Sequence, residues 1–461
     1  MVGVVSARPA VAPPPAWRFP AVRRSALANG LVIETVHLPG RPVAVAVLGL
    51  DVPLAAEPPG LDGALLAMAH TFAEGAGHLT SDELVSRLAR VGATWFPGSG
   101  PDGPRLVVEV PTAGLGTALQ LLAVAVAEPR FPADAVRRYA TRTAAQLDAY
   151  AAGGTQVDVI NAMVDPGHRM SRRVEGDADS LRALTSEALL ELHSSVVGPD
   201  RATLIVVGDL STVDVPALAE RSFSGWAARA RLATAHPAPV PRATPRLIVV
   251  ERPGAEQTRL ALGTFGPDRG SPDWPALTVA GHVLGFGATS LINSALRERD
   301  GYSYGFDTRL VPLRRGSVFS IAGAIRGDAT PDALSGLLDI LHRARLEGLD
   351  PARCESARKH LVRTMPLMFE TPRAVAQSRA GLIGAGLSED YQDAHIAAVG
   401  AVTPIEASEA LARAVDPAAL TLVVVGDPGH CDPGRLRLAM SEATRSGRSG
   451  GNEAAVMKRW R

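Results

Sequence analysis

The stretch Ala202-Thr-Leu-Ile-Val-Val-Gly-Asp209 decides the fold, because it recurs later in the chain as Leu420-Thr-Leu-Val-Val-Val-Gly-Asp427. A second pair of segments repeats at nearly the same distance. Pro39-Gly40 precedes an apolar run over 43–50, and Pro253-Gly254 precedes a similar run over 258–265. The first pair is offset by 218 residues and the second by 214. Two matches in the same order predict one unit of about 210 residues that occurs twice.

The repeat and the composition between its copies predict the domain organisation. Residues 227–245 are rich in Ala and Pro and have no apolar periodicity, so we expect them to link an N-terminal half, 20–226, to a C-terminal half, 246–440. The proline-bearing segment 1–19 lacks the continuous apolar core of a signal peptide and is expected to be a disordered arm. Residues 441–461 are expected to form a flexible tail.

The overall composition excludes several classes of protein. The chain has 461 residues, of which 46% are hydrophobic, and its 47 basic residues balance its 47 acidic ones. That balance argues against a nucleic-acid partner, which requires a basic surplus. No run of 18 apolar residues is present, so we expect no membrane-spanning helix. The two cysteines, Cys354 and Cys431, fit a reducing compartment, and we expect a cytoplasmic protein.

Local patterns within the first half predict an α+β fold, a layer of helices on a mixed, mostly antiparallel sheet. The β-branched runs 31–35 and 43–50 are interpreted as a hairpin that turns at Pro39-Gly40, and Leu204 to Val207 as an interior strand that closes the half. Helical spacing and a Thr80/Glu83 capping box predict the helices. The helical segments are a buried helix through Leu61, Leu65, Met68 and Phe72, the helix that Thr80 opens and Gly92 ends, and helices over 115–127 and 133–150.

The order of these motifs resembles the insulinase/pitrilysin zinc peptidases, in the short-chain branch that contains mitochondrial processing peptidase and its bacterial relatives. The resemblance covers residues 20–430. It rests on the Gly60-Leu61 helix with its exit Glu74-Gly75-Ala76-Gly77, on the repeated Val-Val-Gly-Asp strand, and on Leu296-Arg-Glu-Arg-Asp-Gly-Tyr-Ser-Tyr304, the most specific of the three. It implies two homologous α+β halves that close with a partner around a chamber, like a clam.

The zinc ligands of that family are missing from this chain. Active members bind zinc through His-x-x-Glu-His, whose two histidines lie on one helical face, and through a carboxylate from a later helix. With Gly60-Leu61 aligned, the histidine positions fall on Gly63 and Ala67, and the glutamate position falls on Leu66. No glutamate occurs between Glu128 and Glu175, where the later ligand should lie. We therefore expect no cofactor in this chain.

A substitute metal site is the alternative. His70, Glu74 and His78 are spaced four and four residues apart, which would bring them near one helical face. Gly75 and Gly77 interrupt that stretch, and each glycine costs about 1 kcal/mol in a helix interior. We expect a helix exit and a loop here, and the sequence leaves open whether the three residues bind any metal.

The second half keeps an Arg/Tyr pair, Arg297 and Tyr304. The resemblance implies that these side chains reach across to the zinc of a facing subunit, where they bind the substrate backbone and the oxyanion of the tetrahedral intermediate. The alternative is structural: Arg297 would pair with Glu298 or Asp300 at the surface, and Tyr304 would be a core strand residue.

A glycine-bearing turn precedes the pair and contains Gly285 and Gly287. The resemblance allows two interpretations of it. The two glycines could form a substrate-guarding loop of the kind known in non-catalytic processing-peptidase subunits, or a plain turn between helices.

A lost metal motif beside a kept Arg/Tyr motif predicts the zinc-lacking, substrate-binding subunit of a heterodimeric zinc endopeptidase. The chain alone is expected to be inactive, and the zinc is expected in a homologous partner that carries His-x-x-Glu-His. Unfolded or short peptides would bind by adding a strand to an exposed sheet edge. The alternative is a non-enzymatic peptide-binding or scaffold protein, like the core subunits that this family lends to respiratory complexes. No nucleic-acid or membrane partner is expected.

Overall fold

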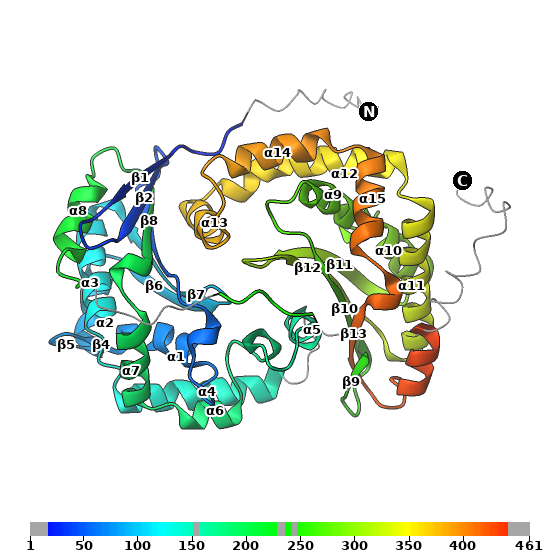
Figure 1. Ribbon diagram of the computed structural model, residues 1–461, viewed down its shortest axis with the longest axis horizontal. Coiled ribbons are helices and arrows are strands. Elements are labelled where there is room, and N and C mark those ends of the chain that lie inside the picture. Colours follow the sequence, from blue (N-terminus) through cyan, green and yellow to red (C-terminus); the bar gives the residue numbers. More distant parts are fainter. Residues whose placement is uncertain (1–16, 151–155, 228–235, 242–246, 441–461) are drawn as a thin grey trace, which may run out of the picture.

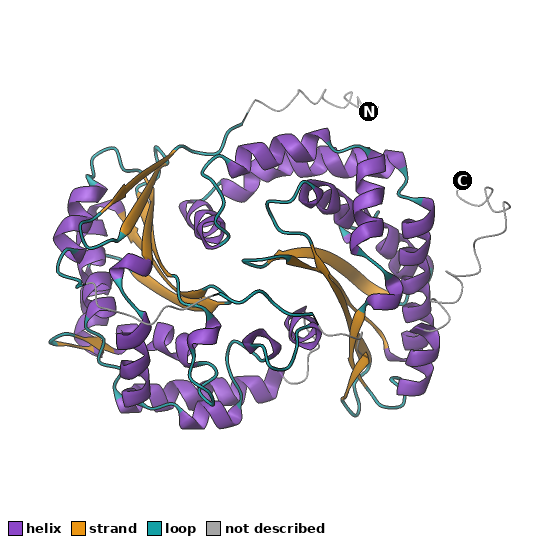
Figure 2. Ribbon diagram, viewed as in Figure 1, coloured by secondary structure: helices purple, strands orange, loops and turns teal. Residues whose placement is uncertain are grey.

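The computed structural model describes residues 17–150, 156–227, 236–241 and 247–440. Two α+β halves lie side by side, and their sheets face each other across the middle of the molecule with most helices outside (Figures 1 and 2). The predicted fold class and the two homologous halves are confirmed.

The N-terminal half contains a six-stranded sheet in the order β1-β2-β8-β3-β7-β6. All neighbours are antiparallel except β2 and β8, which are parallel. The strands are β1 (Val22–Ala26), β2 (Val32–His37), β3 (Val43–Leu50), β6 (Thr94–Gly100), β7 (Gly103–Pro111) and β8 (Ala202–Gly208), and a separate short pair is formed by β4 (Gly75–Ala76) and β5 (Leu79–Thr80).

The C-terminal half repeats this arrangement with five strands in the order β11-β12-β10-β13-β9, in which only β13 and β9 are parallel. The strands are β9 (Leu247–Glu251), β10 (Gln257–Gly266), β11 (Ser303–Pro312), β12 (Ser317–Arg326) and β13 (Thr421–Gly426). Among the described strands of the two main sheets, only β1 has no counterpart, so the duplication inferred from the two repeated segments extends to the strand order.

The two repeated sequence motifs contact each other in both halves. The Asp209 carboxylate, directly after β8, accepts a 2.9 Å hydrogen bond from the Gly40 N–H. The Asp427 carboxylate, directly after β13, accepts a 2.7 Å bond from the Gly254 N–H. Each Gly-Asp pair therefore caps the Pro-Gly turn of its own half, which explains why the two motifs repeat together.

The predicted hairpin between the first two apolar strands is wrong. β2 and β3 are not paired with each other, because β8 lies between them and bonds to both. β8 consists of Ala-Thr-Leu-Ile-Val-Val-Gly, and both its faces are buried, so its backbone polar groups need partners on both edges. The interior position predicted for Leu204 to Val207 is confirmed.

The predicted helices of the first half are present, although Leu61 lies before the first helix, Ala64–Thr71, and Phe72 lies in the 3-10 turn that follows it. The Thr80 hydroxyl accepts the Glu83 N–H and the Glu83 carboxylate accepts the Thr80 N–H, which forms the expected capping box. The helices of this half are α1 (Ala64–Thr71), α2 (Ser81–Arg90), α3 (Leu115–Ala127), α4 (Ala133–Tyr150), α5 (Gln156–Met163), α6 (Ala178–Ala183), α7 (Ser186–Val196) and α8 (Val215–Phe223), with 3-10 turns η1 (Leu54–Ala56), η2 (Phe72–Glu74), η3 (Thr112–Gly114), η4 (Arg169–Ser171) and η5 (Pro199–Arg201).

The second half is helix-rich in the same way. Its helices are α9 (Asp273–Gly285), α10 (Leu291–Asn293), the π-helix η6 (Ser294–Arg299), α11 (Thr330–Glu347), α12 (Pro351–Thr364), α13 (Pro372–Gly384), α14 (Tyr391–Ala401) and α15 (Pro404–Ala414), with 3-10 turns η7 (Gly327–Ala329), η8 (Met365–Phe369) and η9 (Pro417–Ala419).

Each half lends one helix to the inner face of the other half's sheet. α13 packs on β3 and β8 of the N-terminal sheet, and α5 packs on β10, β12 and β13 of the C-terminal sheet (Figure 1). Arg379 of α13 and Glu34 of β2 form an ion pair across the two halves, with both side chains 2% exposed and nitrogen–oxygen distances of 2.9–3.0 Å. Apolar contacts and a buried ion pair thus hold the halves together.

Parts of the predicted linker, arm and tail lie outside the described residues, namely 228–235, 242–246, 1–16 and 441–461. Residues 17–19 were predicted to be the end of the disordered arm, but in the structure they pack against the C-terminal half. The Trp17 ring stacks on Phe369 at 5.4 Å, and Phe19 meets the same ring edge-on. Within the described residues, no helix combines the length and apolar character needed to span a bilayer.

Candidate functional site

Gly63, the position of the first zinc-binding histidine, has a conformation that excludes a side chain. It lies at the N-terminus of α1 with φ of 94°, in the left-handed region that favours glycine. A Cβ atom built there would lie 2.3 Å from the Glu175 carbonyl oxygen. A histidine at position 63 would therefore strain the backbone and also collide with it.

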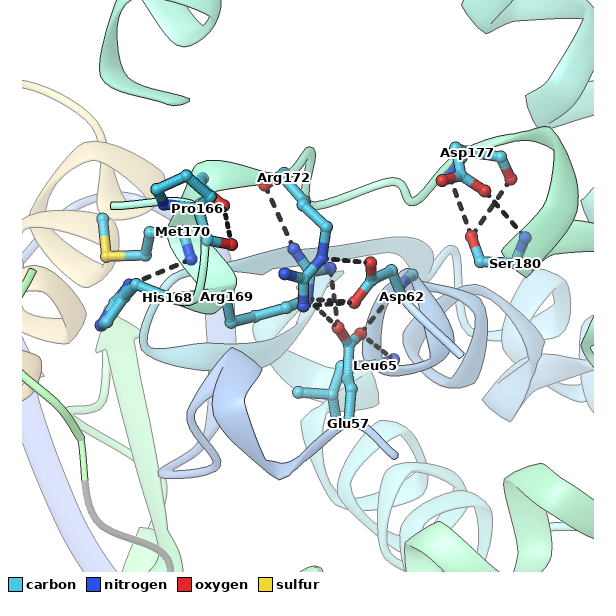
Figure 3. A network of polar contacts seen from close by, with 12 residues as sticks. Glu57, Asp62, Leu65, Pro166, His168, Arg169, Met170, Arg172, Asp177 and Ser180 are labelled. Carbon is cyan, nitrogen blue, oxygen red and sulfur yellow. Dashed lines mark hydrogen bonds and ion pairs between the residues drawn. The ribbon is translucent and has the colours of Figure 1, made fainter. Parts of the chain in front are cut away.

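A buried ion-pair network lies at the same end of α1 (Figure 3). The Arg169 guanidinium, from η4, places its Nε atom 2.7 Å from the Glu57 carboxylate and 2.8 Å from that of Asp62. The side chain of Arg169 is 5% exposed and that of Glu57 is 0% exposed. Arg172 adds a second guanidinium at 2.5 Å from Asp62. Two carboxylates and two guanidinium groups thus balance in charge.

Glu57 also holds the first turn of α1. Its Oε1 atom accepts hydrogen bonds from the Gly63 N–H at 3.1 Å and the Leu65 N–H at 2.9 Å. These are two of the N–H groups that a helix N-terminus leaves without partners. Burial raises the pKa of Glu57 above its usual value, against the opposing effect of the Arg169 charge. The network thus fixes the helix end that carries the metal ligands in active members.

The other two metal-motif positions do not present polar atoms either. Ala67 is fully buried and Leu66 is partly buried, both within the apolar core that α1 forms with the sheet. From α4, the helix expected to supply the third ligand, the buried ring of Tyr139 lies 5.2 Å from that of His70. Burial raises the Tyr139 pKa to about 12. These residues do not fit a zinc ion.

The three residues considered as a substitute site lie in different local structures. α1 ends at Thr71, so His70 is helical while Glu74 lies in η2, and His78 follows the short strand β4. The Glu74 carboxylate bonds Arg138 at 3.1 Å. In the part of the chain that the structure describes, no group of three His, Cys, Asp or Glu side chains could hold a metal ion.

Arg297 lies in the π-helix η6 and is half-exposed. Ser290 caps the preceding α10 by accepting the Asn293 N–H. The Arg297 side chain is 49% exposed and its Nε atom lies 3.4 Å from the Glu298 carboxylate. The same helical segment borders a cavity of about 610 Å³ through Ser294 and Arg299, and Arg297 is not among the lining residues.

Tyr304 lies near the start of β11, the edge strand of the C-terminal sheet. It is 80% exposed, so its predicted alternative role as a core strand residue is wrong. Ser303 pairs with Ile325 and Gly305 pairs with Ala324, which leaves Tyr304 as the extra residue of a β-bulge. Bulges redirect a side chain, and here the phenol projects away from the sheet core.

The glycine-bearing turn before α10 is exposed at its tip. Gly285 ends α9, Gly287 has φ of 74°, and Phe286 between them is exposed. The Phe286 ring stacks on His282 at 4.4 Å and lies 5.1 Å from His360. Burial, followed by the nearby His360 charge, lowers the His282 pKa to about 4. The structure therefore gives the turn a fixed aromatic anchor, while its role toward substrate stays a prediction.

Sequence reasoning missed two buried polar residues near these positions, Arg169 and Asn293. The carboxylate partners of Arg169 lie more than 100 residues away in the chain, so no local spacing pattern reveals them. Asn293 lies in the sequence between the glycine-bearing turn and Arg297, just before the quoted motif, and its proximity to both was the available signal.

Comparisons with known proteins agree with the predicted resemblance. Residues 183–361 match the family described as Peptidase M16 inactive domain. An uncharacterized zinc protease of Mycobacterium tuberculosis is 28% identical over 206 residues, 44% of this chain and 47% of that protein, so the match spans about half of that relative's length. A corresponding protein of Mycobacterium leprae is 24% identical over 361 residues, 75% of this chain and 78% of the relative.

Solved structures extend the similarity to the whole fold. The M16 inactive domain from Pseudomonas fluorescens has a TM-score of 0.80 at 20% identity, covering 88% of this chain and 98% of that one. A protease from Helicobacter pylori has a TM-score of 0.79 at 19% identity, covering 89% and 100%. The resemblance to this peptidase family is confirmed.

Proposed function

We propose that this chain is the non-catalytic, substrate-binding subunit of a heterodimeric zinc endopeptidase. The match of residues 183–361 to the M16 inactive-domain family and the M16 fold of the chain support this proposal. The substrates are unfolded or short peptides, with leader-peptide removal as one form of this activity. A homologous partner carries His-x-x-Glu-His and the zinc, and this chain supplies Arg297 and Tyr304 to the partner's active site.

One observation supports this proposal above the others: both motif residues lie on backbone irregularities, one in the edge strand β11 and the other in the helical segment that packs beside it. Arg297 is in a π-helix and Tyr304 is the extra residue of a β-bulge. Both irregularities disrupt regular backbone bonding and occur preferentially at functional sites. An 80% exposed tyrosine adds little to stability, so packing does not account for its presence.

The two side chains are suited to stabilising negative charge. A guanidinium offers a fixed fork of donors, and a phenol offers one O–H that can be aimed at a single oxygen. Donors held toward a carbonyl oxygen that gains charge during peptide hydrolysis are worth about 100- to 1,000-fold in rate. In this chain both groups would bind the peptide backbone and donate to that oxygen.

The edge strand β11 offers a place for the peptide. Among the described strands it pairs only with β12, so no strand covers its outer edge. Asn293 already bonds the N–H and carbonyl of Phe306 on that edge, and an added strand would use other outer backbone groups of β11. Strand addition recognises backbone rather than side chains and requires an extended peptide. An unfolded or short substrate follows from this mode of binding.

A scaffold role is the alternative, and the same fold occurs in Complex III of Candida albicans, where the match has a TM-score of 0.75 at 13% identity and covers 91% of this chain and 100% of that one. Structural support alone does not require a guanidinium and a phenol at an exposed edge. Substitution of these two residues therefore separates the two functions.

Reconstitution tests the proposal. The purified chain is analysed for zinc by mass spectrometry and assayed on a quenched fluorescent peptide of unstructured sequence, alone and after mixing with an M16 chain that carries His-x-x-Glu-His. We expect far less than one zinc per chain, no activity from either chain alone, and cleavage from the mixture. A tightly bound stoichiometric zinc in this chain, or a stable complex without peptidase activity, would refute the proposal.

A further inference from the structure

One buried amide connects the three elements around the Arg/Tyr pair. Asn293, the last residue of α10, is 4% exposed. Its Nδ2 atom donates to the Phe306 carbonyl oxygen and to that of Gly287, both at 3.0 Å, and lies 3.4 Å from that of Gly285. Its Oδ1 atom accepts the Phe306 N–H at 2.7 Å. Every polar atom of this side chain is bonded to backbone.

These bonds define where both motif residues lie. Phe306 is two residues after Tyr304 on β11, and Arg297 is four residues after Asn293 along the same helical segment. The Asn293 carboxamide also lies close to the bulge itself, since a Cβ on Gly305 would be 3.8 Å from its Oδ1 atom. The amide thus joins the π-helix to the bulged strand at the point where each departs from regular geometry.

We infer that Asn293 is a positioning residue, which holds Arg297 and Tyr304 at a fixed separation and anchors the Gly285–Gly287 turn beside them. The inference rests on the proposed function, because it concerns the geometry of that same pair. Donors toward a reacting carbonyl are effective only when their geometry is set in advance, and a displacement of about 1 Å costs on the order of 100-fold in rate.

Only an amide satisfies this set of contacts. The Phe306 N–H needs an acceptor and the carbonyl oxygens need a donor, and asparagine supplies both from one planar group. An aspartate would keep the acceptor and place its second oxygen against carbonyl oxygens. A leucine of similar size would leave these buried backbone groups without partners.

The chain contains a matched control in Asn29, which bonds backbone in the same way far from the motif. Its Nδ2 atom donates to the Phe223 carbonyl oxygen at 2.8 Å and the Trp226 carbonyl oxygen at 3.0 Å, and its Oδ1 atom accepts the Leu31 N–H at 3.2 Å. Asn29→Ala therefore reports what loss of a backbone-bonding amide does to the fold alone.

The test compares Asn293→Ala with Asn29→Ala in two measurements. In the full chain, hydrogen exchange at the Phe306 amide is expected to accelerate in Asn293→Ala and to stay unchanged in Asn29→Ala. In the complex with the zinc-bearing partner, on the quenched fluorescent peptide, kcat is expected to fall about 10- to 100-fold in Asn293→Ala with a smaller change in KM. Asn29→Ala is expected to keep the wild-type kcat.

A double variant separates the possible failures. If Asn293 acts through Tyr304, the two substitutions are not independent. The fold-decrease in kcat of the double variant Asn293→Ala/Tyr304→Phe is then smaller than the product of the fold-decreases of the two single variants. Wild-type kcat in Asn293→Ala, while Arg297→Ala and Tyr304→Phe are impaired, overturns only the role of Asn293. Wild-type kcat in all three variants overturns the proposed function and this inference with it. Equal kcat losses in Asn293→Ala and Asn29→Ala also overturn the inference, because the effect is then one of stability.

Discussion

Replacing Arg169 with methionine should strongly destabilise the N-terminal half. The substitution removes the guanidinium that lies 2.7 Å from Glu57 and 2.8 Å from Asp62 and leaves the fully buried Glu57 carboxylate without its ion partner. Breaking a buried pair by deleting one partner typically costs about 3–5 kcal/mol. At about 2–4 °C per kcal/mol for a domain of this size, the thermal midpoint should fall by roughly 6 to 20 °C.

The pH dependence of this loss provides a further check. Burial raises the pKa of Glu57 in the folded protein, so the folded state holds this proton more tightly than the unfolded state and stability falls as pH rises through that range. Without Arg169 the pKa rises further, because the one nearby guanidinium bonded to Glu57 is gone. The stability that Arg169→Met loses should therefore be larger at pH 7 than at pH 4.5, which lies below the raised pKa of Glu57.

Thermal unfolding followed by circular dichroism at both pH values measures this difference. Arg182→Met is the matched control, because Arg182 pairs with Asp179 on the surface with both side chains mostly exposed. Such a pair contributes less than about 1 kcal/mol. Equal thermal midpoints for the Arg169→Met and Arg182→Met variants would refute the reasoning about the network. A loss of thermal midpoint in Arg169→Met that becomes larger at the lower pH would refute it as well.

Three other outcomes follow from the geometry. The triple variant Gly63→His/Leu66→Glu/Ala67→His should be less stable than the wild type, because a Cβ at position 63 lies 2.3 Å from the Glu175 carbonyl oxygen. It should still bind no stoichiometric zinc in metal analysis, and one tightly held zinc per chain would contradict this. Arg379→Met should cost about 3–5 kcal/mol in urea unfolding, and adding Glu34→Leu should recover much of the loss; a deeper loss in the double variant would refute an isolated buried pair. Burial, with a smaller contribution from Asp350, raises the Cys354 pKa to about 11. A disulfide reagent at pH 8 should therefore label this thiol only after unfolding, and rapid labelling of the folded chain would contradict its burial.

Features that depend on local sequence could be predicted. The helices over 115–127 and 133–150 and the Thr80/Glu83 capping box lie where the sequence placed them, because apolar spacing and capping involve residues within a few positions of each other. The duplication was also visible, since the repeated strand and the repeated turn bond to each other in both halves.

Features that depend on distant partners could not be predicted. The first hairpin was wrong because β8, more than 150 residues later, takes the position between β2 and β3. Likewise, an apolar helix face indicates burial without indicating against which sheet, so the exchange of α5 and α13 between halves has no local signal.

The candidate site divides in the same way. Loss of the metal ligands was evident from residue identity alone. The left-handed conformation of Gly63, the Arg169 network and the bonds of Asn293 all depend on backbone geometry and on side chains brought together by folding. The exposure of Tyr304 likewise followed only from its place at a bulge on an edge strand.

Steady-state kinetics of the assembled complex test the central claim most directly. With a zinc-bearing partner held constant, Arg297→Ala and Tyr304→Phe in this chain should each lower kcat by about 100- to 1,000-fold while gel filtration shows an intact dimer. Both positions are exposed, so neither change should shift the thermal midpoint of the chain by more than a few degrees. Full turnover in both variants would contradict the account, since this chain would then take no part in the reaction.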